Sequence, residues 1–382
     1  MEVVERIISY ACTDGGYTGR SLSLVSRCIH QVASPVRFHS VALNGFRHIE
    51  SFLACLEKQR SESHAPVHHL FLSTWADGEE VVRVRDGHQP RWNGLRCYQS
   101  AAFEDSPQWA GWMTLQEAMD RKLSHLLPRL LQMVAPDLCT LSIVHSWEFG
   151  AIQLPRTFPL LRDLTFSGPP PHFPGWTTLP DIPSPPPPCL PSLKHLHVIC
   201  SHASIAFWTY HAPNMVYLRL SDLSSSATTL VAELQCSVGS SGASLHRHGC
   251  SFTKAYVLSD IRSPTRTYHH PSLRHVRLQP RVPQGHGEAD PYIEHSWFIW
   301  QLKKMHTALG VRVEVLRDRR YPDGYWDARI KEDWVSNVFS HPGWWSGGEE
   351  LEDGDELDVL DPKDSTGPVD RLLSQWAQEQ QP

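Results

Sequence analysis

Residues 270–278 read HPSLRHVRL, and the spacing within this stretch decides the fold of the chain. Leu273, Val276 and Leu278 follow Pro271 by two, five and seven positions, and an arginine separates the last two. Alternation of apolar and polar residues is the period of a β-strand that buries one face. The stretch therefore predicts a short strand that begins a few residues after a proline.

The same spacing occurs at several earlier places in the chain. Four further segments carry apolar residues two, five and seven positions after a proline: APDLCTLSI (135–143), FPLLRDLTF (158–166), LPSLKHLHV (190–198) and APNMVYLRL (212–220). A shortened copy, APVHHLFL, occupies residues 65–72. The prolines at 136, 159, 191 and 213 are 22 to 32 residues apart, and repeats of roughly 20–29 residues are typical of leucine-rich-repeat proteins. We therefore predict an α/β fold, an irregular leucine-rich-repeat solenoid with parallel strands.

The repeat spacing also predicts which side chains face the core. The residues five positions after each proline are expected to be buried equivalents in neighbouring strands: Leu141, Leu164, Leu196, Leu218 and Val276. The residues four and six positions after the proline face the other way. In the last three copies we expect these outward residues to form a target-binding face: His195, His197, Tyr217, Arg219, His275 and Arg277.

An acidic or phosphorylated partner would suit this predicted face, because arginine pairs with carboxylate and phosphate through two hydrogen bonds. Histidines with an ordinary pKa of about 6.5 would gain charge on mild acidification. Binding is therefore expected to tighten as the pH falls from about 7.5 to about 6. The alternative is that these side chains form only the solvated face of a sheet.

Composition argues against several classes of protein. The 382 residues carry a net charge of −6, unlike a nucleic-acid-binding protein that depends on phosphate contacts. The nine cysteines are scattered without a C-x-x-C pair, a pattern of reduced thiols. No apolar run approaches the roughly 18–20 residues of a membrane span, and Glu2, Glu5 and Arg6 interrupt any signal-peptide core. We expect a soluble cytoplasmic or nuclear protein with no membrane or nucleic-acid partner, a monomer within a complex.

The first 45 residues differ from the rest. Apolar residues recur at helical spacing in EVVERIISYA (2–11) and in LSLVSRCIHQVASPVRFHSV (22–41), so the sequence predicts two helices around a TDGGYTG turn. These segments resemble the F-box, a small helical domain whose pattern is roughly LPxEIxxxILxxL…LxxVSRxWxxLxxPxLW. The LVSR tetrad at 24–27 matches, whereas the opening Leu-Pro is absent and Ile29 stands where tryptophan is usual.

The resemblance to the F-box implies a partner, because that domain docks on the adaptor subunit of cullin–RING ubiquitin ligases. The whole chain resembles basidiomycete fungal F-box-like proteins. The positions that correspond to adaptor-binding residues are Val3, Val4, Ile7, Ile8, Leu22, Leu24, Val25 and Ile29. The implied function is that of a substrate receptor of an SCF-type (cullin–RING) ubiquitin ligase with an unknown target protein. The alternative is a repeat scaffold for protein–protein interactions without ligase connection, whose first helices only cap the solenoid.

The predicted organisation has four parts. Residues 1–45 form the F-box-like helical module, and residues 46–320 form a linker helix and the solenoid with insertions at 76–112, 168–190 and 235–269. TLQE at 114–117 predicts the start of a helix that reaches Val134 and kinks at Pro128. Residues 321–345 are expected to form a C-terminal helical cap, and residues 346–382 an acidic, largely disordered tail. The cap would use Ile330, Trp334, Val338 and Phe339.

No motif in the sequence predicts catalysis, a cofactor or a metal site. HRHGC at 246–250 contains metal-ligand residue types but has no fourth ligand at a suitable spacing. GSSGAS at 239–244 lacks the lysine of a phosphate-binding loop and the order of a nucleophile elbow. We therefore predict a protein that is not an enzyme and needs no metal or other cofactor.

Overall fold

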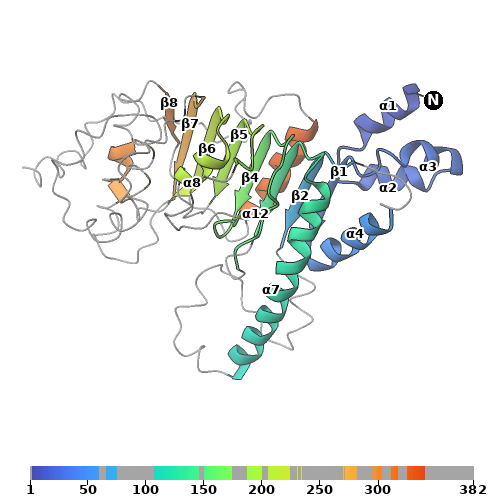
Figure 1. Cartoon of the computed structure of the whole chain (residues 1–382), viewed down its shortest axis with the longest axis horizontal. Helices are drawn as coiled ribbons and strands as arrows, with labels where there is room; N and C mark the ends of the chain where they lie inside the picture. Colours follow the sequence, from blue (N-terminus) through green and yellow to red (C-terminus); the bar gives the residue numbers. More distant parts are fainter. Residues whose placement is uncertain are drawn as a thin grey trace, which may run out of the picture.

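The fold is built around one parallel β-sheet. The computed structural model describes residues 2–59, 66–74, 107–145, 150–173, 187–199, 205–223, 230, 234, 270, 272–281, 295–296, 298–302, 311–316 and 325–339. Within these ranges eight strands form a single sheet, in which every neighbouring pair is parallel and the spatial order follows the sequence (Figure 1). The prediction of an α/β fold with parallel strands is confirmed at this level.

The strands are short and regularly placed. Their bounds are β1 Ser40–Asn44, β2 His69–Ser73, β3 Thr140–Val144, β4 Asp163–Ser167, β5 His195–Ile199, β6 Tyr217–Leu223, β7 His275–Pro280 and β8 Arg312–Val315. The six proline-initiated segments are β2 to β7, and β3 to β7 each begin four positions after the proline. β1 and β8 lack that spacing, and the sequence analysis missed both.

One row of apolar side chains runs through six neighbouring strands without a break in register. Its members, each at most 1% exposed, are Leu70, Leu141, Leu164, Leu196, Leu218 and Val276. A second row on the same face is also buried: Leu72, Ile143, Phe166, Val198, Leu220 and Leu278. The predicted burial of the five equivalent residues in parallel strands is therefore confirmed.

Helices α4 (Gly45–Gln59), α7 (Pro107–Val134) and α8 (Ile205–His211) share one hydrophobic core with these rows. α4 is the predicted linker helix, and its apolar residues Ile49 and Leu53 are buried. The ring of Trp208 on α8 packs 5.9 Å from that of Phe166. α7 begins at Pro107, seven residues before the predicted start, because proline lacks the N–H that the first helical turn leaves unbonded. Pro128 lies inside α7 as the sequence indicated.

The N-terminal module contains three helices rather than two: α1 (Glu2–Ala11), α2 (Tyr17–Ser23) and α3 (Arg27–Ala33). The second predicted helix is divided because the hydroxyl of Ser26 accepts a hydrogen bond from the backbone N–H of Ile29 and so starts a new helix. Gly15 has φ of 78°, and a Cβ there would lie 2.9 Å from the Cβ of Ala42. The N–H of Ala42 donates to the Gly15 carbonyl at 3.1 Å, so this turn joins the module to β1.

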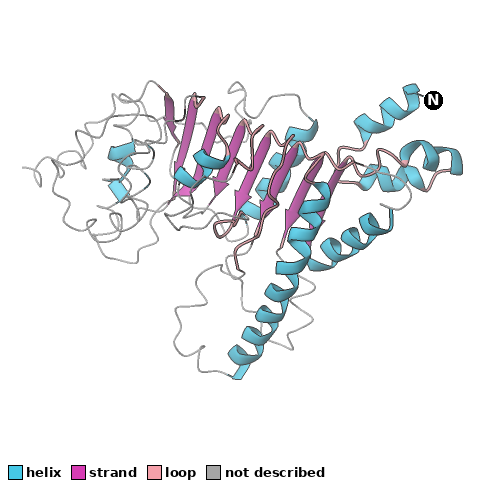
Figure 2. Ribbon diagram, in the orientation of Figure 1, coloured by secondary structure: helices cyan, strands magenta, loops and turns pink. Residues whose placement is uncertain are grey.

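Helix α12 (Tyr325–Phe339) occupies an unexpected place. It was predicted to form a C-terminal cap, but it packs on the outward face of the sheet, opposite α4 and α7 (Figure 2). The Trp334 ring lies 5.8 Å from that of Phe71 on β2, and Ile330 belongs to the same cluster as Val144 and Ile199. The prediction was wrong in position because outward positions of β2, β3 and β5 carry apolar side chains that need cover.

Some predicted segments lie outside the described residues. These include residues 76–106 of the first insertion, 174–186 of the second, all of 235–269 and the tail from 346 to 382. Among the described helices, none is both long enough and apolar enough for a bilayer crossing.

Replacing Leu196 with alanine tests the importance of the buried row. Leu196 is fully buried in the middle of the sheet, so Leu196→Ala should lower the free energy of unfolding by about 2–5 kcal/mol. Lys194→Ala, two residues earlier and exposed, is the matched control and should change it by less than about 0.5 kcal/mol. Urea denaturation followed by circular dichroism measures both, and a Leu196 variant as stable as wild type would contradict the buried row.

Candidate functional site

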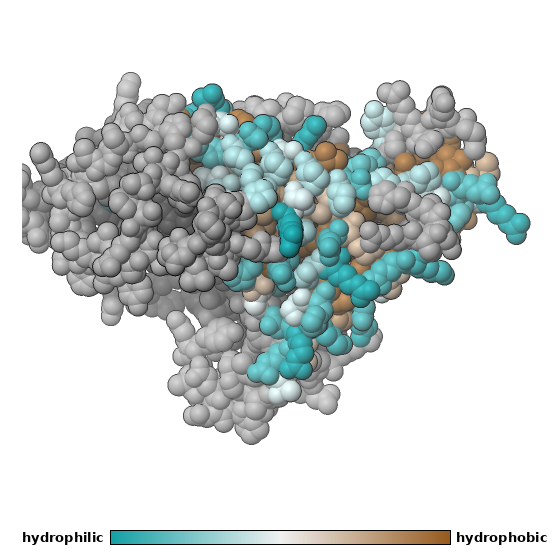
Figure 3. Space-filling model, viewed as in Figure 1, coloured by the Kyte–Doolittle hydropathy of each residue, from teal (hydrophilic) through white to brown (hydrophobic). Residues whose placement is uncertain are grey.

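Exposed apolar side chains gather on the N-terminal helices. On α1 these are Val4, Ile7 and Tyr10, and Ile7 is 61% exposed. Residues three apart on a helix lie on one face, so the three side chains form one apolar stripe. Figure 3 shows hydrophobic residues, in brown, over this end of the molecule. A contiguous exposed apolar surface is typical of a site that binds a partner.

A second group of exposed apolar side chains lies at the corner between α2 and α3. Leu24 and Val25 are 80% and 68% exposed. Their backbone N–H groups donate to the carbonyls of Ser21 and Leu22 at 3.1 Å, and Ser26 starts the next helix directly afterwards. The corner is therefore held by hydrogen bonds while its two apolar side chains point into solvent.

The residues predicted to bind an adaptor divide into two groups. Val4, Ile7, Leu24 and Val25 are exposed and available to a partner. The remaining described members stabilise the module instead: Ile8 is buried, and Leu22 and Ile29 pack against the cluster of Ile8, Cys12, Val32 and Ala33. The side chain of Val3 lies outside the described residues. We name Val4, Ile7, Tyr10, Leu24 and Val25 the apolar docking surface. Tyr10 was missed, although its spacing from Ile7 could have revealed it.

The residues of the predicted target-binding face lie in two rows, as the repeat spacing indicated. His195, Tyr217 and His275 are register partners, and so are the next outward residues on the same strands, His197, Arg219 and Arg277. The expectation of an open, solvated face is nevertheless wrong for His197 and Tyr217, which are 1% and 6% exposed.

Neighbouring rings account for the burial of Tyr217. Its ring stacks on that of His275 with centroids 5.4 Å apart, and His195 lies 6.2 Å away on the other side. The guanidinium of Arg277 lies 5.5 Å from the same ring. Strands about 4.8 Å apart bring such large side chains into contact, so each shields the next from water.

His197 cannot act as the predicted charge switch. Its Nε2 is hydrogen-bonded to the hydroxyl of Ser221 at 2.9 Å. Burial, with the neighbouring charge of Arg219 as a second cause, holds the pKa of His197 well below its ordinary value. Acidification to about pH 6 would therefore leave His197 neutral. The predicted tightening of target binding at lower pH cannot depend on this residue.

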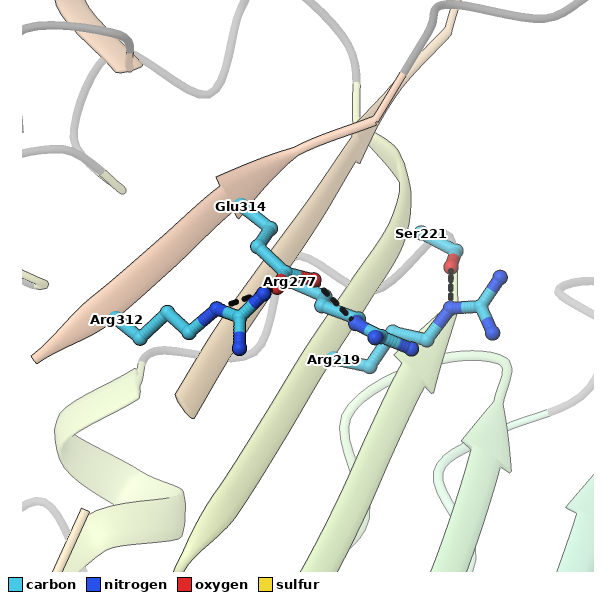
Figure 4. A network of polar contacts seen from close by, with 5 residues as sticks. All are labelled: Arg219, Ser221, Arg277, Arg312 and Glu314. Carbon is cyan, nitrogen blue, oxygen red and sulfur yellow. Dashed lines mark hydrogen bonds and ion pairs between the residues drawn. The ribbon is translucent and has the colours of Figure 1, made fainter. Parts of the chain in front are cut away.

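A charged network lies at the β6–β8 end of this face (Figure 4). Glu314 on β8 accepts hydrogen bonds from Arg277 Nε at 2.6 Å and Arg312 Nε at 2.7 Å. Arg219 donates to Ser221 at 3.2 Å and to Gln279 at 3.3 Å. One carboxylate thus serves two guanidinium groups, which leaves this end of the face with an excess of positive charge. The alternation in RVEV (312–315) was the signal that could have identified β8 and Glu314.

Helix α12 adds one carboxylate to this face. Asp333 forms an ion pair with Arg329, whose Nε lies 3.0 Å from the carboxylate. Burial raises the pKa of Asp333 to about 6. Attraction to the charges of Arg329 and Arg219 opposes that rise. The charge of Arg219 on β6 therefore acts on a carboxylate of α12, the helix that packs on this side of the sheet.

A second group of histidines lies around the start of β2, and their rings pack against one another. The ring centroids of His39, His68 and His69 are 4.7 to 6.4 Å apart. Burial lowers the pKa of His39 to about 4 and that of His69 to about 3, so both stay neutral. Burial also raises the pKa of the nearby Cys139 thiol, which makes it a poor nucleophile. Within the described ranges no three His, Cys, Asp or Glu side chains could hold a metal ion.

Comparison with known proteins assigns no family to this chain. No family model matches the sequence, and no curated protein or solved structure matches it either. The functional inference depends on the arrangement of side chains in this chain and on the resemblance of its first helices.

Glu314→Gln tests the charged network. The change would leave Arg277 and Arg312 side by side without their shared carboxylate, so the free energy of unfolding should fall by about 1–3 kcal/mol. Because salt screens repulsion between the two cations, the loss should shrink between about 0.05 and 0.5 M NaCl. Glu332→Gln, at an exposed position of α12, is the control. A loss equal at both salt concentrations would refute the charge-sharing account.

Proposed function

We propose that this chain is a substrate receptor of an SCF-type (cullin–RING) ubiquitin ligase. In this proposal α1 to α3 form an F-box-like module that binds the adaptor subunit, and the sheet binds the target protein. The observation that carries the proposal is the apolar docking surface. Four of its five residues, Val4, Ile7, Leu24 and Val25, are positions at which the F-box resemblance implies adaptor contacts.

The energetics of this surface favour a partner. Fully burying a side chain such as leucine or isoleucine contributes about 1.5–3 kcal/mol, so covering Ile7 and Leu24 would offset much of the entropy lost on association. The module does not need these side chains for its own folding, because Ile8, Cys12, Val32 and Ala33 form its core. Exposure of large apolar residues with no structural role therefore supports docking.

The sheet is suited to hold a target near the ligase. Its parallel strands follow one another in sequence order, which agrees with a leucine-rich-repeat solenoid, in which each repeat contacts only its neighbours and the stack forms an extended platform. In the proposed mechanism no residue of this chain performs covalent chemistry. The receptor raises the effective concentration of the target beside the ubiquitin-charged enzyme.

One observation favours the alternative of a repeat scaffold without ligase connection. The module packs directly on the edge of the sheet, where the hydroxyl of Ser40 donates to the Thr13 carbonyl at 3.0 Å and Trp334 would lie 3.6 Å from a Cβ on Gly15. These contacts suit a cap on the first strand. These contacts leave the apolar docking surface uncovered. A cap alone gives that surface no role, whereas adaptor binding does.

The proposal is tested by pull-down of a cullin–RING adaptor with the full chain. Ile7→Asp combined with Leu24→Asp places two charges in the docking surface and should weaken adaptor binding by roughly tenfold or more. Ile8 is not a suitable position, because a charge there would disrupt the module core. Gln31→Asp, which adds a carboxylate at an exposed polar position of α3, is the matched control and should bind like wild type.

Circular dichroism and thermal unfolding of each variant show that the module remains folded. A folded double variant that binds the adaptor as tightly as wild type would refute docking through this surface. A wild-type chain that binds no adaptor would favour the scaffold function.

A further inference from the structure

Two arginines on neighbouring strands bond to the same carboxylate through only one nitrogen each. Arg277 on β7 and Arg312 on β8 both reach Glu314 through Nε, and the carboxylate lies between them (Figure 4). Within the described part of the chain, no hydrogen bond or ion pair uses the terminal Nη1 or Nη2 atoms of either arginine. Each guanidinium therefore keeps the N–H groups with which arginine binds an anion through two parallel hydrogen bonds. We name Arg277, Arg312 and Glu314 the arginine corner.

The arginine corner is ordered before any ligand arrives. Glu314 holds both guanidinium groups, and that of Arg277 also lies 5.5 Å from the centre of the Tyr217 ring. The side chain of Arg312 is 66% exposed and that of Arg277 is 22% exposed, so a ligand can reach both from solvent. Because a side chain that is already held in place loses little conformational entropy on binding, this arrangement favours recognition of an anion.

The charges of the arginine corner favour a carboxylate over a phosphate. Its two arginines and one glutamate carry a net charge of +1. The charge of Arg219 on the next strand is opposed by Asp333 on α12. One carboxylate balances the corner, whereas a phosphate monoester, with a charge close to −2 at about pH 7.5, exceeds it. The whole chain has a net charge of −6, so attraction of an acidic ligand has to come from a local site of this kind.

We propose that the arginine corner binds an acidic segment of the target protein, with an aspartate or glutamate carboxylate on the terminal nitrogens of Arg312, beside the charge of Arg277. Glu314 orients both arginines but also weakens binding, because its charge repels the incoming carboxylate. Removing that charge should therefore destabilise the fold and strengthen binding, two effects of opposite sign. This inference rests on the proposed function, since it assigns a chemical class to the target of the receptor.

The probe is fluorescent hexaglutamate, titrated by anisotropy into the full chain at about pH 7.5 and about 0.05 M NaCl, without an adaptor. Arg312→Gln removes the more exposed guanidinium and should weaken binding at least about threefold. Arg312→Lys keeps the charge but loses the planar fork, so its affinity should lie between those of wild type and Arg312→Gln. Arg121→Gln removes an exposed arginine from α7, on the other face of the sheet, and is the matched control that should bind like wild type.

Glu314→Gln separates a binding site from an ion-pair network that only stabilises the fold. This variant should bind hexaglutamate about threefold more tightly than wild type, although it is less stable. The peptide should also raise its midpoint of thermal unfolding more than that of wild type, because a ligand stabilises the folded state in proportion to its affinity. A network with a structural role alone predicts no change in peptide binding.

Equal hexaglutamate binding by wild type, Arg312→Gln and Glu314→Gln would overturn the proposal. A peptide of three phosphoserines alternating with glycines carries a similar total charge at this pH. Tighter binding of this phosphopeptide through Arg312 would overturn the assignment to a carboxylate. Because no adaptor is present, failure of this proposal is distinguishable from failure of the ligase function: a chain that binds no adaptor can still bind the peptide.

Discussion

The rest of the structure depends on the row of buried side chains from Leu70 to Val276. Because strand residues alternate between two faces, burying this row fixes the register of six strands at once. A shift of one residue would expose every member of the row to water. The sequence repeat is irregular in length, but its proline and three apolar positions keep the same spacing, so the connections vary while the sheet remains continuous.

The same constraint explains the two candidate binding surfaces. Once one face is committed to the core, the outward residues become ladders of like side chains, such as the stacked rings around Tyr217 and the arginines that share Glu314. Because these side chains cover one another and α12 covers part of the face, the sheet offers less open surface than its polarity indicates. The N-terminal module keeps its apolar side chains outside, where nothing in the described residues covers Ile7 or Leu24.

The sequence was informative wherever one local period decided the outcome. It predicted β2 to β7 and the burial of Leu196, because the spacing after proline is a property of a single strand. It missed β1 and β8, which lack the spacing of apolar residues after a proline, and misplaced α12, whose position depends on Phe71 and Ile199 far away in the chain. Exposure also escaped prediction: Ile7 and Ile8 are equally apolar, and only the packing of three helices leaves one outside and buries the other.

The central claim is that the in-register core leaves the surface of α1 and the α2–α3 corner for a partner. Hydrogen–deuterium exchange of the full chain, alone and with a cullin–RING adaptor, tests it most directly. The account predicts slow exchange in β2 to β7 in both samples. It also predicts new protection confined to residues 4–11 and 20–29 when the adaptor is present. Fast exchange in these strands, or adaptor-induced protection only outside the N-terminal module, would contradict it.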